Sequence, residues 1–291
     1  MLYDIALKIG YTYETPASGA RHVIRLLPLN LAPDQRLIAG SVTILPLPSE
    51  RRDFTDFFGN AASSVHFRSN HDRLDISMQA RVQVESRRPD ADPSPDLAGL
   101  AAELATIWRM DAASPHHYLA DSPRLARNEA ISAYAAALVR PGISVRALTE
   151  ALCAAIHADF AYDPDATHVD TPPGDAFSLR KGVCQDFAHI MIAGLRSLGI
   201  PAGYVSGYLR TIPPPGRQRL DGADAMHAWV RAWCGREAGW VELDPTNNMV
   251  AAIDHIRAGY GRDYSDVAPV IGILKSYGSH TTLQSVDVIP V

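Results

Sequence analysis

The sequence predicts an α+β protein in which an all-β part precedes a mixed part. Residues 1–88 contain short runs of alternating apolar and polar residues, separated by turn signals and without a helical stripe. Apolar residues at helical spacing follow up to residue 198, and further alternating runs come after them. The length of 291 residues suggests about two domains. We therefore expect a small β-sandwich at 1–88, a linker at 89–96 and a second domain at 97–291.

The expected strands of the first domain follow from period-two alternation, which buries one face of a strand. The turn signal Gly59-Asn60 predicts a hairpin between 54–58 and 65–67. The other predicted strands are 3–9, 74–78 and 80–85. The next residues, 87–96, are polar and rich in proline, which is typical of a linker.

Two apolar stripes predict helices after the linker. Their members are Ile131, Tyr134, Ala135 and Leu138 in the first, and Val145, Leu148, Leu152 and Ile156 in the second. Pro141-Gly142 separates the two stripes, and Ser144 is the expected cap of the second helix. Cys153 falls inside that helix and is interpreted as a core residue, since a free cysteine behaves as a small apolar side chain.

A third predicted helix starts at Cys184. Its stripe is Ala188, Met191, Leu195 and Leu198, and Gly199 ends it. The first turn of a helix favours an anion, because unpaired N–H groups and the helix dipole point there. The position therefore favours a thiolate at Cys184, although a lone cysteine at a helix start is more often a packing residue.

Strands are expected after this helix at 204–210, 225–233, 239–244 and 282–289. A tight connection at 235–238 would pair residue 234 with 239, which places residue 229 opposite 244. Since side chains alternate, His227 and Asp244 then share a face as diagonal neighbours. The carboxylate can bind one imidazole nitrogen and leave the other for a thiol, so Cys184, His227 and Asp244 form the pattern of a catalytic triad.

Composition excludes several other classes of protein. A formal net charge of −5 gives no reason to expect a nucleic acid or an anionic membrane as partner. Neither a signal peptide nor a membrane span is recognisable, so a cytoplasmic location is expected. The three cysteines match no zinc or disulfide spacing, and His116, His117, His157 and His168 show no ligand spacing. No metal and no cofactor are expected.

Three motifs resemble the core motifs of the transglutaminase-like superfamily, in that family's order of Cys, His and Asp. They are Gly-Val-Cys-Gln-Asp-Phe-Ala at 182–188, His-Ala-Trp-Val at 227–230 and Gly-Trp-Val-Glu-Leu-Asp-Pro-Thr at 239–246. The resemblance covers about 115–250 closely, and residues 1–86 and 261–264 resemble parts of bacterial members. It implies a papain-like core, in which the nucleophile helix packs against an antiparallel sheet. At matching positions it implies Cys184 as nucleophile, His227 as base and Asp244 as orienting residue.

The expected activity is acyl transfer from an amide or peptide bond through a thioester at Cys184, with hydrolysis favoured over transfer to an amine. The expected partner is a peptide or another amide-bearing substrate. A true cross-linking transglutaminase and an inactive binding module on the same fold remain alternatives. The backbone N–H of Cys184 is one expected oxyanion donor, with Gln185 and Tyr162 as candidates for the second. Trp229, Trp240 and Asp186 are candidates for the lining of the cleft.

Overall fold

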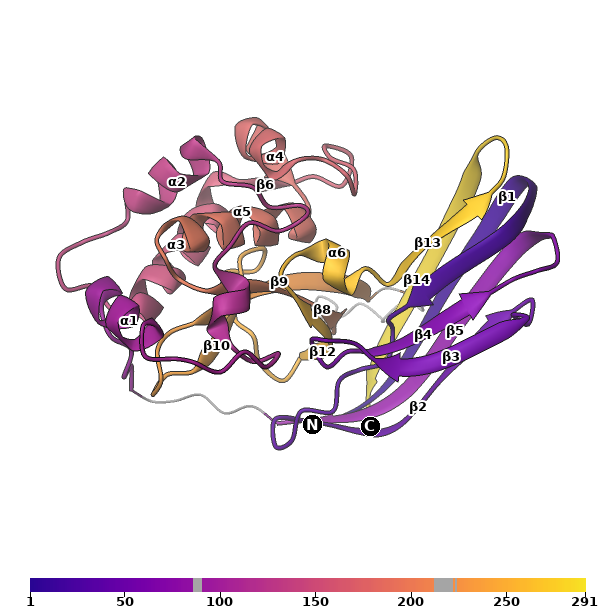
Figure 1. The fold of residues 1–291 in the computed structure, drawn as a ribbon, viewed down its shortest axis with the longest axis horizontal. Helices are drawn as coiled ribbons and strands as arrows, with labels where there is room; N and C mark the ends of the chain where they lie inside the picture. Colours follow the sequence, from indigo (N-terminus) through magenta and orange to yellow (C-terminus); the bar gives the residue numbers. More distant parts are fainter. Residues whose placement is uncertain (86–90, 212–221, 223) are drawn as a thin grey trace, which may run out of the picture.

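The computed structural model describes residues 1–85, 91–211, 222 and 224–291 of the chain. It has three layers: a group of helices, a five-stranded sheet and a curled seven-stranded sheet (Figure 1). Both sheets are antiparallel throughout. The prediction of an α+β fold, with an all-β part at the start of the chain, is confirmed.

The helices are α1 (Leu97–Leu104), α2 (Glu129–Ala136), α3 (Val145–Asp159), α4 (Pro173–Leu179), α5 (Cys184–Ser197), α6 (Tyr264–Val267) and the 3₁₀ helix η1 (Pro115–Tyr118). The strands of the seven-stranded sheet are β1 (Leu2–Ile24), β2 (Gln35–Leu45), β3 (Glu50–Thr55), β4 (Ala61–His66), β5 (His71–Val84), β13 (Val270–Lys275) and β14 (His280–Pro290). The five-stranded sheet contains β8 (Ala202–Leu209), β9 (Ala225–Trp233), β10 (Trp240–Asp244), β11 (Met249–Val250) and β12 (His255–Gly261). The short strands β6 (Ala161–Tyr162) and β7 (Lys181–Gly182) pair in parallel.

The curled sheet is organised around β1. The first half of this strand pairs with β5 and β14, and its last residues pair with β4 and β13. Because one long strand runs through both halves, they form a single bent sheet rather than the two separate sheets of the expected sandwich. The predicted hairpin is present as β3 and β4, and Gly59 in its turn has a φ of 88°, which favours glycine.

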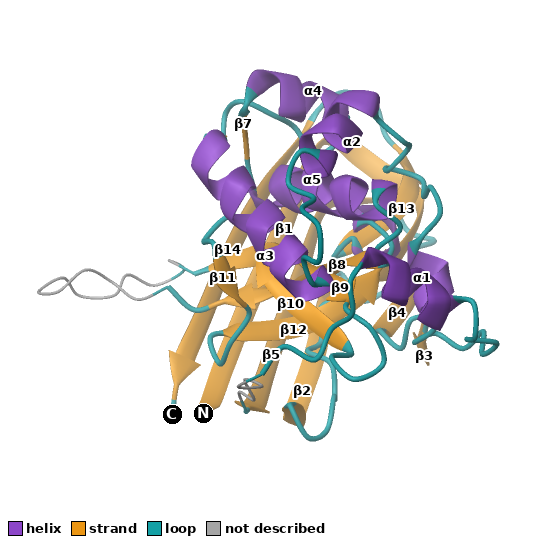
Figure 2. Cartoon of the chain, turned by 90° about the vertical axis from the view of Figure 1, so that its left-hand side faces the viewer, coloured by secondary structure: helices purple, strands orange, loops and turns teal. Residues whose placement is uncertain are grey.

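The two C-terminal strands also belong to the curled sheet. We expected a strand at 279–291 as the end of the second domain, and β14 lies there, but it pairs with β1 from Tyr3 opposite Pro290 to Tyr13 opposite His280. The reason is burial, since Val286 and Val288 enter the core of this sheet. The curled sheet therefore contains strands from both ends of the chain, and the two chain ends lie next to each other in Figure 2.

The helices cover one face of the five-stranded sheet (Figure 2). The stripe predicted for α5 is confirmed, because Ala188, Met191 and Leu195 are fully buried against β8 and β9. Ser144 caps α3 as expected by accepting the backbone N–H of Ala147 at 3.1 Å, and Cys153 is buried in the same core.

The curled sheet covers the other face. Tyr208, Ile256 and Ala258 from β8 and β12 are buried in the core of the curled sheet. The hydroxyl of Tyr208 donates to the carbonyl of Leu26 at 2.6 Å, so polar bonds also join the two sheets. The five-stranded sheet is therefore covered on both sides, and side chains on either face can be withdrawn from water.

Part of the predicted linker, residues 89 and 90, lies outside the described residues. Residues 91–96 contain no helix or strand, and the carbonyl of Pro95 accepts the N–H of Val145 at the start of α3. The division into two domains at this point stays a prediction. In the described part of the chain, every helix is too short or too polar to cross a bilayer.

Candidate active site

Cys184 is the first residue of α5, as the sequence predicts. Two bonds to the buried carboxylate of Asp186 fix the approach to the helix: the N–H of Val183 donates at 2.9 Å and the hydroxyl of Thr167 at 2.6 Å. Asp186 therefore caps the nucleophile helix and is 2% exposed. Its expected place in the cleft lining is wrong, because the helix start draws its carboxylate inward.

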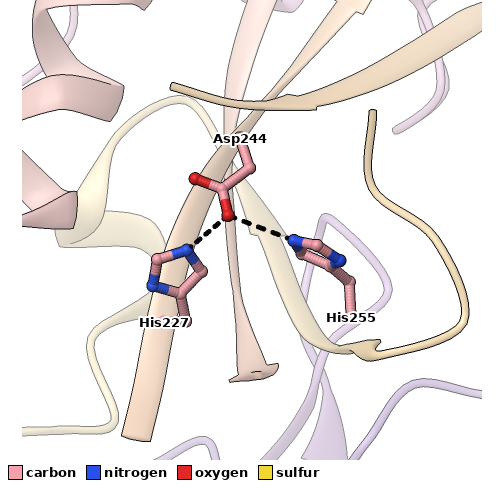
Figure 3. Close-up of side chains that lie close together, drawn as sticks. All are labelled: His227, Asp244 and His255. Atoms are coloured by element: carbon pink, nitrogen blue, oxygen red, sulfur yellow. Dashed lines mark hydrogen bonds and ion pairs between the residues drawn. The ribbon is translucent and has the colours of Figure 1, made fainter. Parts of the chain in front are cut away.

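His227 and Asp244 meet across two neighbouring strands. The observed pairs between β9 and β10 include Trp233 opposite Trp240, which is the register that the sequence predicts. The imidazole Nε2 of His227 lies 2.8 Å from Oδ2 of Asp244 (Figure 3). Since Nε2 is used here, Nδ1 is the nitrogen left for Cys184.

The Asp244 side chain is fully buried and surrounded by N–H donors. Oδ1 accepts the backbone N–H groups of Thr246 at 2.9 Å and Asn247 at 3.2 Å. Oδ2 accepts the side-chain amide of Asn247 at 2.7 Å and an N–H of His227. Burial raises the pKa of Asp244, but the bonds from His227 and His255 outweigh it and hold the pKa far below its ordinary value. The carboxylate is therefore ionised and fixed in one orientation.

His227 is poised to carry a proton. Burial lowers its pKa, but hydrogen bonds with Asp244 and Cys184 raise it more, to about 10. His227 thus interacts with Asp244 through the 2.8 Å hydrogen bond and also with the Cys184 thiol, which contributes to the rise of its pKa. By contrast, burial raises the pKa of both Cys153 and Cys234 to about 12, so neither thiol is ionised near neutral pH.

A second histidine, His255, lies on the other side of Asp244. Its Nε2 is 3.2 Å from Oδ2 of Asp244, and its Nδ1 accepts the backbone N–H of Ala252 at 3.3 Å (Figure 3). His255 was not predicted from the sequence. A short alternating run, His-Ile-Arg-Ala at 255–258, was the available signal for β12, but Gly259 and Gly261 interrupt the pattern.

A buried carboxylate next to Asp244 organises the floor of the site. Glu242 accepts the indole N–H of Trp229 at 2.8 Å, the guanidinium of Arg257 at 2.9 Å and the hydroxyl of Tyr260 at 2.8 Å. Burial raises its pKa, but the charge of Arg257 and these bonds hold the pKa below its ordinary value. Both carboxylates of β10 thus receive donors from β9 and β12: Asp244 one from each strand, and Glu242 one from β9 and two from β12.

Trp229 is part of this floor. Its side chain is fully buried, and its ring stacks with His227 at 6.2 Å between ring centres and makes an edge contact with His255 at 5.1 Å. The expectation that Trp229 lines the cleft is wrong, because its side chain is fully buried against His227, Glu242 and His255.

Trp240 lies at the other end of β10 from Asp244. Its ring packs on the guanidinium of Arg231 at 3.8 Å and against the ring of Tyr118 at 5.0 Å. These contacts give it a packing role, and its expected place in the cleft lining stays a prediction.

The two candidates for the second oxyanion donor differ in position. Tyr162 is 60% exposed, and its pKa is raised by burial and by the nearby Cys184, so its phenol lies close to the nucleophile. The side-chain amide of Gln185 donates to the carbonyl of Val169 at 2.9 Å and points to that loop. The donor role stays a prediction for both residues.

Within the described ranges, His227, Asp244 and His255 form a group that can offer three metal ligands within 4.8 Å of one another. Hydrogen bonds account for their spacing, since both imidazoles reach the same carboxylate oxygen. His116 and His157 instead bond backbone carbonyls, those of Ile107 at 3.0 Å and Thr246 at 2.9 Å. The absence of a metal stays an expectation.

Comparison with known proteins agrees with this geometry. An uncharacterized protein of Mycobacterium tuberculosis is 36% identical over 99% of this chain and 92% of its own length. A protein of Pseudomonas aeruginosa called protein-glutamine gamma-glutamyltransferase is 40% identical over 31% of this chain and 14% of its own length. A crystal structure from Cytophaga hutchinsonii, described as a "Putative Cysteine Protease", has the same fold, with a TM-score of 0.74, 22% identity and coverage of 99% of this chain and 90% of that one.

Two family models also match the chain. Residues 3–83 match the bacterial transglutaminase-like N-terminal region. Residues 132–245 match the transglutaminase-like superfamily, and this range holds all three residues of the expected triad. On the shared sequence, the matching motifs and the fold, the chain belongs to the transglutaminase-like superfamily.

Proposed function

We propose that the protein is a thiol enzyme that attacks amide or peptide bonds through Cys184. The observation that carries the proposal is the linked arrangement of Asp244, His227 and Cys184, with the thiol at the start of α5. A thiol next to an oriented imidazole and a helix start is suited to nucleophilic catalysis. The two other thiols of the chain are buried and are assigned no chemical role.

In the proposed reaction, the Cys184 thiolate attacks the amide carbonyl carbon, and the carbonyl π electrons move to oxygen. When the tetrahedral intermediate collapses, the C–N bond breaks and the His227 imidazolium gives its Nδ1 proton to the departing amine. A thioester remains on Cys184. Water or an amine then attacks the thioester while His227 removes its proton, and the thiolate leaves with the C–S bond electrons.

The backbone N–H of Cys184 is proposed as one oxyanion donor, since N–H groups in the first turn of a helix have no partner within the helix. The phenol of Tyr162 is the proposed second donor, on the strength of its exposure and its proximity to Cys184. The substrate is proposed to be a peptide or another amide-bearing molecule. A reducing compartment such as the cytoplasm suits the three unpaired cysteines.

Water is the proposed acceptor. An amine competes with ~55 M water only if a pocket holds it against the thioester, because proximity compensates for its lower concentration. Asp186 is the carboxylate nearest to the nucleophile in sequence, but it caps α5 and is unavailable to attract a cationic amine. Transfer to an amine is the second candidate, favoured by the name of the Pseudomonas aeruginosa relative. An inactive binding module is the third.

The test presents casein and glutamine-containing peptides together with a labelled primary amine, and follows free acid, ammonia and labelled donor. Hydrolysis predicts that acid appears faster than labelled donor. The Cys184→Ala variant should lose both products, and the matched Cys153→Ala variant should keep them. Faster accumulation of labelled donor would replace hydrolysis by amine transfer. Equal activity of the Cys184→Ala variant would remove the thiol mechanism altogether.

A further inference from the structure

We propose that His255 is a positioning residue that holds the Asp244 carboxylate in the orientation required by His227. The proposal rests on the proposed function, since it assigns His255 a part in the same triad. It does not make His255 a catalytic residue, because His255 is 1% exposed and reaches Asp244 from the opposite side to His227 (Figure 3).

The protonation state of His255 follows from its two contacts. Its Nδ1 faces the backbone N–H of Ala252 at 3.3 Å, and an N–H can only donate, so Nδ1 must accept. The ring proton of a neutral imidazole is then on Nε2, which faces Asp244 at 3.2 Å. The Ala252 N–H thus selects the tautomer that can donate to the carboxylate.

His255 also limits the rotation of the carboxylate. Oδ2 of Asp244 receives Nε2–H groups from His227 on β9 and His255 on β12, and the Asn247 amide as a third donor. Because these donors lie on separate elements, Oδ2 of Asp244 cannot move with the His227 ring without breaking its hydrogen bond to His255 or Asn247. The triad is therefore fixed from the side of Asp244 as well as from the side of the helix.

The close packing of β12 and Trp229 around β8 depends on Gly207. In the register of the sheet, Gly207 lies between His227 of β9 and Arg257 of β12. A side chain at 207 would collide with the Trp229 ring and with the carbonyl of Ile256. The missing side chain leaves space in which Trp229 packs against both imidazoles. Sequence positions far from the three motifs thus complete the surroundings of the triad.

A purely structural role for His255 predicts different behaviour. In that case His255 only satisfies the Ala252 N–H and fills a buried space, and its loss would lower the stability without changing the reactivity of Cys184. The rate at which iodoacetamide alkylates Cys184 separates the two roles, because it reports on the Cys184–His227 pair and needs no substrate.

The experiment compares the full-length protein with the variants His255→Leu and His255→Gln. Leucine removes the donor, so Cys184 alkylation at pH 7 should slow by about tenfold, the effect of losing one hydrogen bond to a charged group. Glutamine keeps an N–H donor at similar reach and should restore most of the rate. His22→Leu removes another buried histidine, in the curled sheet, and should leave the rate unchanged.

A second measurement uses the wild-type protein and does not depend on how the variants fold. In ¹⁵N-histidine-labelled protein, the ring nitrogens of His255 should show the neutral tautomer with the proton on Nε2. A proton on Nδ1 would overturn the proposal, as would a His255→Leu variant that folds and alkylates at the wild-type rate. If no amide donor is turned over, the proposed function fails, but both measurements still decide the role of His255.

Discussion

The ring of Trp229 lies nearly parallel to the imidazole of His227, with ring centres 6.2 Å apart and planes inclined by 26°. The indole N–H is anchored on Glu242, so this aromatic surface cannot shift without breaking a buried hydrogen bond. His227 is therefore held by Asp244 in the plane of its ring and by Trp229 on its face. A change in the packing around Trp229 should therefore shift the His227 ring.

The packing can be tested at Gly207. The substitution Gly207→Ala places a methyl group against the backbone oxygen of Ile256 and the Trp229 ring, so we expect a loss of about 1–3 kcal/mol in the free energy of unfolding. Urea denaturation gives this value, and slower alkylation of Cys184 should accompany it. Gly10→Ala, whose methyl group meets only a flexible Asp75 side chain, is the control. Equal losses in the two variants would contradict the tight packing at 207.

The reactivity of the three cysteines gives a second prediction. With a pKa of about 12, Cys153 and Cys234 are ionised to about one part in 10⁴ or less at pH 7.5, and both are buried. Brief exposure to limiting iodoacetamide should label Cys184 first, as read by peptide mapping. His227→Gln should slow this labelling. Uniform labelling of the three thiols in the folded protein would argue against an activated Cys184.

Replacement of Asp244 by asparagine should harm both activity and stability. Asn247 donates to both carboxylate oxygens of Asp244, with its backbone N–H to one and its side-chain amide to the other. An asparagine at 244 has only one accepting oxygen, so in either orientation its NH₂ group faces an N–H donor of Asn247. We expect turnover to fall by roughly 10⁴-fold, as in the serine-protease precedent. The free energy of unfolding should fall by about 1–3 kcal/mol. Wild-type turnover by the Asp244→Asn variant would remove Asp244 from the triad.

The pH dependence follows from His227. Its pKa in the folded protein is raised from 6.5 to about 10, so the imidazolium that protonates the leaving amine persists through neutral pH. Amide turnover should fall as the pH rises through about 10, whereas alkylation of Cys184 should not, because it needs only the thiolate. A fall of turnover centred near pH 6.5 would show that His227 is not held in this way.

The same shift predicts how stability depends on pH. Because the folded-state pKa is higher, the stabilisation from His227 protonation is complete below about 6.5 and is lost as the pH rises through about 10. The stability advantage of the wild-type protein over His227→Gln, measured by urea denaturation, should shrink across this range. An advantage that grows with pH would have the wrong sign.

Metal removal should have no effect. Nε2 of His227 and Nε2 of His255 both face Oδ2 of Asp244, as expected if each ring N–H donates a hydrogen bond to this oxygen. Dialysis against a chelator should therefore leave alkylation and turnover unchanged. Activity that is lost on chelation and restored by Zn²⁺ would show that His227, Asp244 and His255 hold a metal instead.

Local patterns predicted the parts of the site that lie close together in sequence. The stripe behind Cys184 located the helix start, and a short turn fixed the register that joins His227 to Asp244. Alternation also placed Trp229 on the same face as His227. It could not show that Trp229 is buried, because Gly207 and His255, which pack against it, lie on other strands.

The same limit explains what was missed. His255 lies on a strand interrupted by glycines, and its partner Asp244 belongs to a strand that β12 does not pair with. The pairing of β14 with β1 joins residues more than 250 positions apart, and apolar alternation specifies a buried face but no partner strand. The sequence therefore predicted the positions of Cys184, His227 and Asp244 better than their surroundings.

The pairing of β1 with β14 has a consequence for synthesis in the cell. The ribosome makes β1 before the other strands of the curled sheet, but the strand that covers its outer edge over residues 3–13 is made more than 250 residues later. Until then this edge offers unpaired backbone groups to other chains. The helices and the five-stranded sheet, which supply all three triad residues, are complete by residue 267. The nucleophile can thus be assembled while the β-sheet beside it still lacks its last strands.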